Sequence, residues 1–77
     1  MANFSVRNAW LSDVLDCINE LPNLTFTLND MYLYERRLQE THPENYNVKA
    51  KIRQQLQFLR DDNKLIFLGN GVYQKII

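Results

Sequence analysis

The sequence predicts an α+β fold in which three helices are combined with a small antiparallel sheet. Apolar residues recur at helical spacing in three separate segments of the 77-residue chain. Near the C-terminus, two short β-branched and aromatic runs flank Gly69-Asn70-Gly71, a sequence typical of a tight hairpin turn. The resulting order is helix, strand, helix, helix, strand, strand, which is the order of elements in a winged helix-turn-helix.

The first helix is expected to begin at Val6, with Ser5 as its N-cap. A serine hydroxyl at that position accepts a hydrogen bond from a backbone N–H that would otherwise have no partner. Residues spaced by three or four positions form the apolar stripe: Val6, Trp10, Val14, Ile18 and Leu21. The acidic residues of this helix are expected to be solvated: Asp13, Asp16 and Glu20. Pro22-Asn23 ends the helix.

Thr25-Phe26-Thr27 combines β-branched and aromatic residues and is predicted to form a short strand. Thr27-Leu28-Asn29-Asp30 resembles a capping box with aspartate in place of glutamate, so a second helix is expected to follow directly. One side of this helix is predicted to carry Leu28, Met31, Tyr34, Glu35 and Leu38. His42-Pro43 ends this helix because a residue that precedes proline is driven away from helical geometry.

The third helix is predicted from Val48 to about Arg60, with Asn47 as its N-cap. Its periodicity places four apolar side chains and one amide on the inward side: Val48, Ile52, Gln55, Leu56 and Leu59. Asp61-Asp62-Asn63 follows, and two acids at this end oppose the helix dipole. We therefore expect a sharp end to the helix.

The C-terminal segments predict the wing. Leu65–Leu68 and Val72–Ile76 are expected to pair as a hairpin, with Thr25–Thr27 as a third strand at its edge, because a two-stranded hairpin alone is barely stable. The chain is thus expected to be one winged-helix domain over residues 1–77. Within it, residues 1–5 form an N-terminal tail, residues 28–60 the helix-turn-helix and residues 65–76 the wing hairpin.

Composition limits the chemistry that this chain can perform. A domain of 77 residues has little room for a catalytic cleft, and the sequence has no Gly-rich phosphate loop, nucleophile elbow or triad spacing. Cys17, the only cysteine, is interpreted as a small apolar helix residue, and His42 has no second histidine or cysteine at metal-ligand spacing. We therefore expect no enzymatic activity, no cofactor and no metal. The lack of a long apolar run or a signal peptide predicts a cytoplasmic, intracellular protein without membrane contact.

The charged residues are unevenly distributed along a chain whose formal net charge is zero. Residues 1–44 carry a net charge of −4, from three cations and seven anions, whereas residues 45–77 carry +4, from six cations and two anions. The segment 45–60 contains four cations and no anion. A positive surface of this kind is what a polyanion such as DNA requires.

The outward side of the third helix has the residue types that read a DNA major groove. Arginine donates two hydrogen bonds to guanine, glutamine pairs with adenine N6 and N7, and a small alanine allows close approach and contact with a methyl group. The residues expected at base edges are Asn47, Lys49, Ala50, Arg53 and Gln54. Those expected nearer phosphates are Lys51, Gln57 and Arg60. The alternative is a solvated helix surface rich in good helix formers.

Two further residues are candidates for DNA contact. Asn70, in the hairpin turn, is placed to meet phosphate or the minor groove, unless the turn sequence serves geometry alone. Tyr46, just before the third helix, either packs on a sugar or a base methyl group or acts as a hydrophobic staple on the helix that follows. The sequence leaves both pairs of alternatives open.

Four segments carry a resemblance to a known family: Phe26-Thr27-Leu28-Asn29-Asp30-Met31-Tyr32, His42-Pro43-Glu44-Asn45, Lys51-Ile52-Arg53-Gln54-Gln55-Leu56-Gln57-Phe58-Leu59-Arg60-Asp61 and Ile66-Phe67-Leu68-Gly69-Asn70-Gly71-Val72-Tyr73. They are similar to the C-terminal winged-helix domain of DpnI-type restriction endonucleases and Dam-replacing proteins. The third segment is the most specific of the four, and the wing pattern is the weaker part.

The resemblance implies a module that binds double-stranded DNA and recognises GATC carrying N6-methyladenine, with Arg53 and Gln54 as the first residues to carry over. In the family this module stands beside a metal-dependent nuclease domain, whose paired carboxylates and lysine are missing from this chain. Cleavage is therefore not implied, and the chain is either an excised part of a longer nuclease or a free-standing protein. Two alternatives stay open: a protein–protein interaction module, and a transcription regulator that reads unmethylated DNA. Because no heptad pattern or additional apolar face is present, we expect a monomer.

Overall fold

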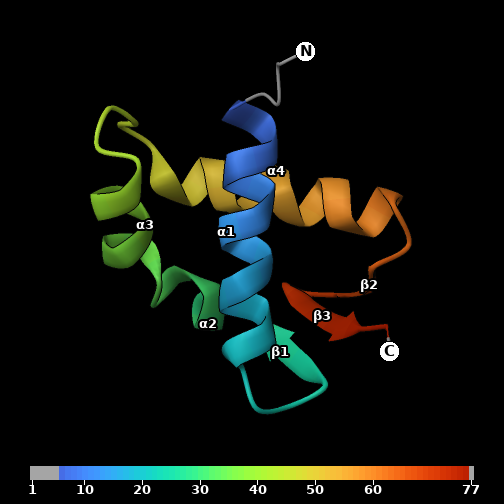
Figure 1. Cartoon of the computed structure of the whole chain (residues 1–77). Helices are drawn as coiled ribbons and strands as arrows, with labels where there is room; N and C mark the ends of the chain where they lie inside the picture. The colour runs from blue at the N-terminus through green and yellow to red at the C-terminus, as the bar shows by residue number, and fades with distance from the viewer. Residues whose placement is uncertain (1–5, 77) are drawn as a thin grey trace.

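The computed structural model describes residues 6–76, with side chains described from residue 9 onward. In chain order it contains α1 (Val6–Glu20), β1 (Thr25–Thr27), α2 (Leu28–Tyr32), α3 (Glu35–Thr41), α4 (Val48–Asp61), β2 (Leu65–Gly69) and β3 (Val72–Lys75) (Figure 1). The α+β class and the small antiparallel sheet are confirmed, and the described residues form four helices where three were predicted. The expected N-terminal tail and the N-cap at Ser5 lie outside the described residues.

The predicted second helix is divided into α2 and α3, so the prediction of one continuous helix was wrong. At the break, the N–H groups of Leu33 and Tyr34 bond carbonyls only three residues back, at 3.3 Å to Asp30 and 3.0 Å to Met31. Bonds of this type wind the chain more tightly than an α-helix does and redirect it. Met31 and Leu38 are both buried. Residues seven apart would also share one side of a continuous helix, so the apolar pattern does not reveal the break.

The sheet has the strand order β1-β3-β2, and both strand pairs are antiparallel. Phe26, Tyr73 and Phe67 lie in register across it, and the rings of Phe26 and Tyr73 stack with their centroids 5.6 Å apart. β1 therefore extends the hairpin at the edge of β3, which confirms the predicted third strand. All residues of the 69–71 turn have positive φ, as expected of a tight turn built from glycine and asparagine.

The two ends of α4 have the hydrogen bonds that hold a helix to a defined length. At the first end, the side-chain oxygen of Asn47 accepts the N–H of Ala50 at 3.1 Å, so the predicted N-cap is confirmed. At the other end, Asn63 has a φ of 60°, and the N–H of Lys64 bonds the carbonyl of Leu59 at 2.8 Å. These are features of a Schellman motif, which accounts for the sharp end.

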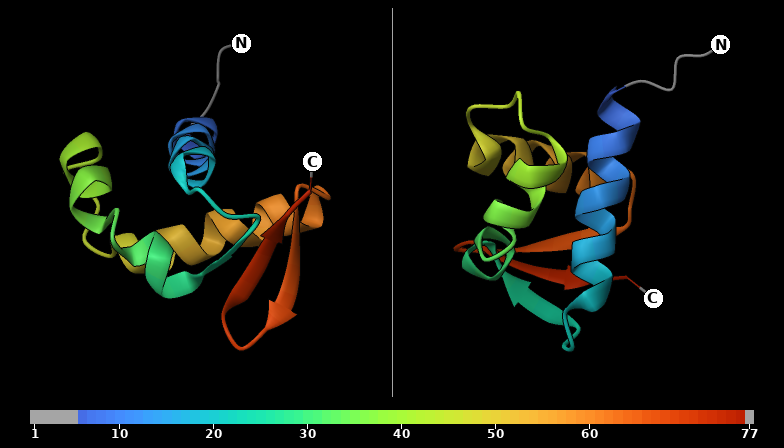
Figure 2. Two further views of the ribbon diagram at one scale, coloured as in Figure 1. Left: turned by 90° about the horizontal axis from the view of Figure 1, so that it is seen from below. Right: turned by 60° about the vertical axis from the view of Figure 1, so that its left-hand side comes forward.

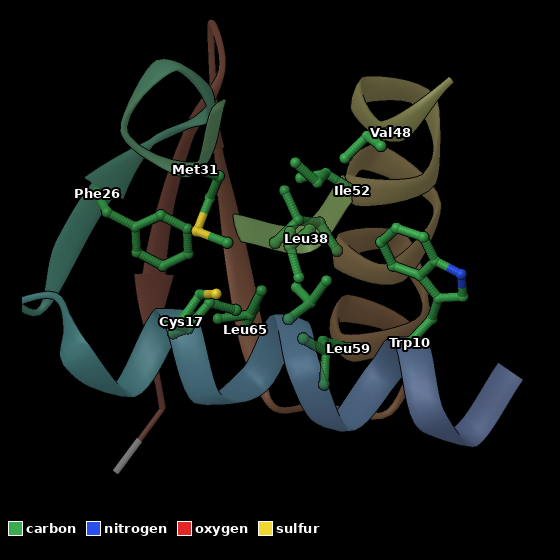
Figure 3. Close-up of a cluster of buried hydrophobic side chains, with 12 residues drawn as sticks. Trp10, Cys17, Phe26, Met31, Leu38, Val48, Ile52, Leu59 and Leu65 are labelled. Carbon is green, nitrogen blue, oxygen red and sulfur yellow. The ribbon is translucent and has the colours of Figure 1, made fainter. Parts of the chain in front are cut away.

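One hydrophobic core joins the helices and the sheet (Figure 3). All of the residues predicted to point inward from α4 are buried: Val48, Ile52, Gln55, Leu56 and Leu59. From α1, Trp10, Val14 and Ile18 are buried, as predicted. α1 packs across α4, and the turn of the β2–β3 wing extends on the other side of α4 (Figure 2, left). α1 therefore contacts only one side of α4.

Two of the acidic residues on α1 tie this helix to α3, so the expectation that they are only solvated was wrong. Arg37 donates hydrogen bonds to the Glu20 carboxylate, with nitrogen–oxygen distances of 2.8 Å, and this contact lowers the pKa of Glu20 below its ordinary value. Oδ2 of Asp13 lies 2.6 Å from Nε2 of His42, whose ring stacks on Trp10 with centroids 4.0 Å apart. These contacts hold α1 against the segment that carries α3.

Cys17 is buried in the core, as expected of an apolar helix residue. Burial raises the pKa of its thiol above the ordinary value of 9.0, because a thiolate would lose its hydration. The unfolded chain therefore ionises this thiol at a lower pH than the folded domain, and we expect the free energy of unfolding to fall as the pH rises above 9.

Urea denaturation at a series of alkaline pH values measures this loss, with Cys17→Ala as the comparison. The variant has no thiol to ionise and should show a flatter dependence on pH. An equal slope in both proteins would contradict the prediction. The loss would then belong to other groups, such as Tyr34 and Tyr73, whose phenol pKa values are also raised by burial.

Candidate nucleic-acid interface

The outward side of α4 has two open grooves. The first, of about 590 Å³, lies between α4 and β3, and its lining includes Arg53, Gln57, Arg60 and Tyr73. The second, of about 450 Å³, lies beside the first turn of α4, and its lining includes Asn45, Tyr46, Asn47 and Lys51. Ala50 and Gln54 line both grooves, so they occupy the centre of this surface.

We call this surface the α4 face and define it by Lys49, Ala50, Lys51, Arg53, Gln54, Gln57 and Arg60. Ala50 and Lys51 are half-buried, and the other side chains are exposed. The structure thus brings together on one surface the α4 residues that the sequence predicts for contacts with bases and phosphates. A small side chain stands at the centre of the α4 face, with cations and amides around it.

Tyr32, at the end of α2, contacts two cations of the α4 face, and it was not predicted as a site residue. Its hydroxyl accepts a hydrogen bond from Nη1 of Arg53 at 2.8 Å, and Nζ of Lys49 lies 5.1 Å from its ring centroid. The first contact orients the guanidinium group, and the second is a cation–π interaction. Tyr32 belongs to a segment that carries the family resemblance, which is the one feature of the sequence that points to it.

Two carboxylates approach the cations of the α4 face, which the charge distribution along the chain did not predict. The side chain of Glu35 is half-exposed, and its Oε1 lies 4.0 Å from Nζ of Lys49. Asp61 lies 3.7 Å from Nε of Arg60. Exposed pairs of this kind contribute little to stability, so a DNA phosphate can replace either carboxylate at small cost.

The family of this chain follows from a match over nearly its whole length. Residues 6–75 match the model of a family described as the Dam-replacing HTH domain, where HTH stands for helix-turn-helix. The chain belongs to this family. The match spans every described helix and strand, and it confirms the resemblance that the sequence motifs indicate. Membership of a helix-turn-helix family supports the binding of DNA.

Two residues at the start of α4 in this Dam-replacing HTH domain have different roles. The side-chain oxygen of Asn47 is engaged by the N–H of Ala50, so its amide nitrogen is the group left for a base. The side chain of Tyr46 is 98% exposed, so it does not pack on α4 and the hydrophobic-staple alternative is wrong. Tyr46 and Ala50 both line the second groove, and the exposed Tyr46 is accessible to a ligand there.

The wing of the Dam-replacing HTH domain does not bring Asn70 to the α4 grooves. Asn70 is exposed and lines a separate groove with Thr27 and Asn29. Tyr73, which was not predicted as a site residue, instead lines the first α4 groove together with Arg60. Burial raises the pKa of the Tyr73 phenol above its ordinary value, so the hydroxyl stays protonated and can donate a hydrogen bond.

Two findings bear on other kinds of site in this Dam-replacing HTH domain. Within residues 6–76, no helix is long and apolar enough to cross a membrane. In the same part of the chain, histidine, cysteine, aspartate and glutamate side chains do not gather in groups of three or more that could hold a metal ion. The ring of His42 is engaged by Asp13 and Trp10 instead.

Proposed function

We propose that this domain binds double-stranded DNA with α4 in the major groove and recognises N6-methyladenine in a GATC context. The observation that carries the proposal is the position of Ala50, a methyl side chain between the two grooves of the α4 face. In a helix-turn-helix, residues near the start of the second helix reach the base edges. Ala50 lies in the first turn of α4 and is therefore placed for base contact.

The chemistry around Ala50 fits a methylated adenine. An N6-methyl group lies in the major groove, and burying it against an apolar surface gains about 0.8 kcal/mol per carbon. The methyl group of Ala50 and the exposed ring of Tyr46 supply such a surface in the second groove. Arg53 follows one turn later and is suited to guanine O6 and N7.

Phosphate contacts are assigned to the rim of the same surface. Lys51, Gln57 and Arg60 border the two grooves and are suited to hold the DNA backbone on either side of the bases. These contacts position the helix without reading sequence. Base recognition is therefore expected to depend on Ala50, Arg53 and Gln54.

Fluorescence anisotropy tests the proposal with one short GATC duplex prepared fully methylated, hemimethylated and unmethylated, each at two salt concentrations. Burial of one methyl group from each strand should favour the fully methylated duplex by at least roughly tenfold. Binding to all three should weaken at higher salt, because phosphate contacts release counterions. Equal affinity for the three duplexes would remove methyl recognition and leave DNA binding. No binding to any of them would contradict the proposal and favour a protein partner.

A further inference from the structure

The orientation of the Gln54 amide is determined by its neighbours. Nζ of Lys51 donates a hydrogen bond to Oε1 of Gln54 at 3.1 Å, and Nε2 of Gln55 donates to the same oxygen at 3.4 Å. An ammonium group only donates, so the Gln54 atom that faces Lys51 must be the amide oxygen. Gln54 is therefore left with its NH₂ group, a donor, to offer to a base.

Gln55 is a polar residue in an apolar core. Its side chain is fully buried, and within the described part of the chain its own Oε1 has no hydrogen-bond partner. A buried oxygen without a partner destabilises a fold, and a methionine of similar size would avoid this loss. Packing alone therefore gives no reason for an amide at position 55, whereas the hydrogen bond from its Nε2 to Gln54 does.

Two other side-chain acceptors in contact with α4 residues are also engaged. Oδ1 of Asn47 accepts the backbone N–H of Ala50 itself at 3.1 Å. The hydroxyl of Tyr32 accepts a hydrogen bond from Arg53 at 2.8 Å. Together with the engaged oxygen of Gln54, these contacts occupy the side-chain acceptors of Asn47, Tyr32 and Gln54, whereas Ala50 offers a methyl group.

Such a surface distinguishes the two forms of adenine. Adenine without a methyl group presents an N6–H donor to the major groove. Opposite Ala50 and a Gln54 whose oxygen is already engaged, this donor loses its water without gaining a partner, which weakens binding. In N6-methyladenine the methyl group takes the place of that hydrogen and packs against Ala50 without such a loss.

We propose that Lys51 and Gln55 make Gln54 a donor-only residue, and that this arrangement selects N6-methyladenine by penalising the N6–H of unmethylated adenine. The inference rests on the proposed function, in which α4 reads the adenine. It replaces the two-bond contact between glutamine and adenine expected from the sequence, because that contact needs a free Gln54 oxygen. Specificity then has a repulsive part in addition to the apolar contact.

The test compares the ratio of dissociation constants for unmethylated and fully methylated GATC duplexes in the original domain, in Lys51→Met, in Gln55→Met and in the double variant. Freeing the Gln54 oxygen should lower this ratio by about tenfold in the double variant, mainly through tighter binding of the unmethylated duplex. The charge lost at position 51 weakens both duplexes alike and cancels in the ratio.

Lys49→Met is the matched control for the lost charge. Lys49 lies on the same turn of α4 but contacts Tyr32 and Glu35 instead of Gln54. Its replacement should weaken binding to both duplexes and leave their ratio as it was. Circular dichroism checks the fold of each variant, and Gln55→Met should melt no lower than the original domain because it removes an unpartnered buried oxygen.

The outcomes separate this inference from the proposed function. A ratio near one in the original domain would refute methyl recognition itself and the inference with it. A clear preference for methylated DNA that persists in the folded double variant would refute the role given to Lys51 and Gln55 and leave the proposed function standing. Gln54→Met gives a second measurement: a side chain that offers no amide oxygen should keep the preference. A larger preference in this variant would show that the Gln54 oxygen already accepts the N6–H of unmethylated adenine in the original domain, which would refute the inference.

Discussion

Replacing Ala50 by glutamate is expected to weaken binding to every duplex by at least about 100-fold while the domain stays folded. Ala50 is the third residue of α4, and an acidic side chain there is favoured by the helix dipole. The same carboxylate would stand at the centre of the α4 face, where it repels phosphates and prevents close approach to the bases. A single substitution is thus expected to reduce DNA affinity without reducing the stability of the fold.

Anisotropy with the methylated duplex measures the loss, and thermal melting followed by circular dichroism measures stability. Ser12→Glu is the matched control, because Ser12 is exposed in the middle of α1 and the variant has the same change in net charge. Its affinity should stay within about threefold of the original, since salt screens a distant exposed charge. Original affinity in Ala50→Glu would place the DNA contact elsewhere on the domain.

Helical periodicity was sufficient to predict which residues of α4 are buried. A period of 3.6 residues assigns each position to one side of the helix, and every predicted inward position is buried, including the polar Gln55. The outward side follows by elimination, so the α4 face could be predicted before its neighbours were known. The Asn47 cap and the turn at residues 69–71 are equally local features, which is why they could be predicted too.

Contacts between elements distant in the sequence could not be predicted in this way. Tyr32 and Arg53 are 21 residues apart, and Asp13 and His42 are 29 apart. Each contact depends on how two helices are oriented relative to each other. The break between α2 and α3 also has a consequence that the pattern does not predict, because it leaves Glu35 beside Lys49 of the α4 face. A periodic pattern assigns each residue to one side of a helix, but it does not identify the residues that this side contacts.

The chemistry of Gln54 shows a second limit, which concerns atoms instead of residues. Glutamine in a recognition helix is typical of adenine contact, and the sequence predicts that contact. The structure shows that the amide oxygen is engaged by Lys51, three residues earlier, and by Gln55. Residue type therefore predicts where a base contact would form, but the partners of the Gln54 amide oxygen determine which base groups this side chain can bind.

Trp10→Ala is expected to reduce the free energy of unfolding by about 3–5 kcal/mol. Trp10 is 2% exposed, belongs to the largest fully buried side chains of the core and stacks on His42. Alanine would leave a cavity between α1 and the rest of the core and would remove the ring that positions His42 beside Asp13. Domains of this size have roughly 4–12 kcal/mol of stability in total, so the variant should lose a large part of it.

Urea denaturation followed by far-ultraviolet circular dichroism measures the change, with Trp10→Phe as the control. Phenylalanine keeps a ring to stack on His42, so the loss should be only about 1–2 kcal/mol. While it is folded, Trp10→Ala should bind DNA as the original domain does, because α1 packs on the side of α4 opposite the α4 face. Trp10→Ala would then lose stability and keep DNA affinity, whereas Ala50→Glu would lose DNA affinity and keep stability. The two variants together would assign stability to the packing of α1 and DNA recognition to α4. A loss below about 1 kcal/mol would instead show that α4 and the sheet hold the core without α1.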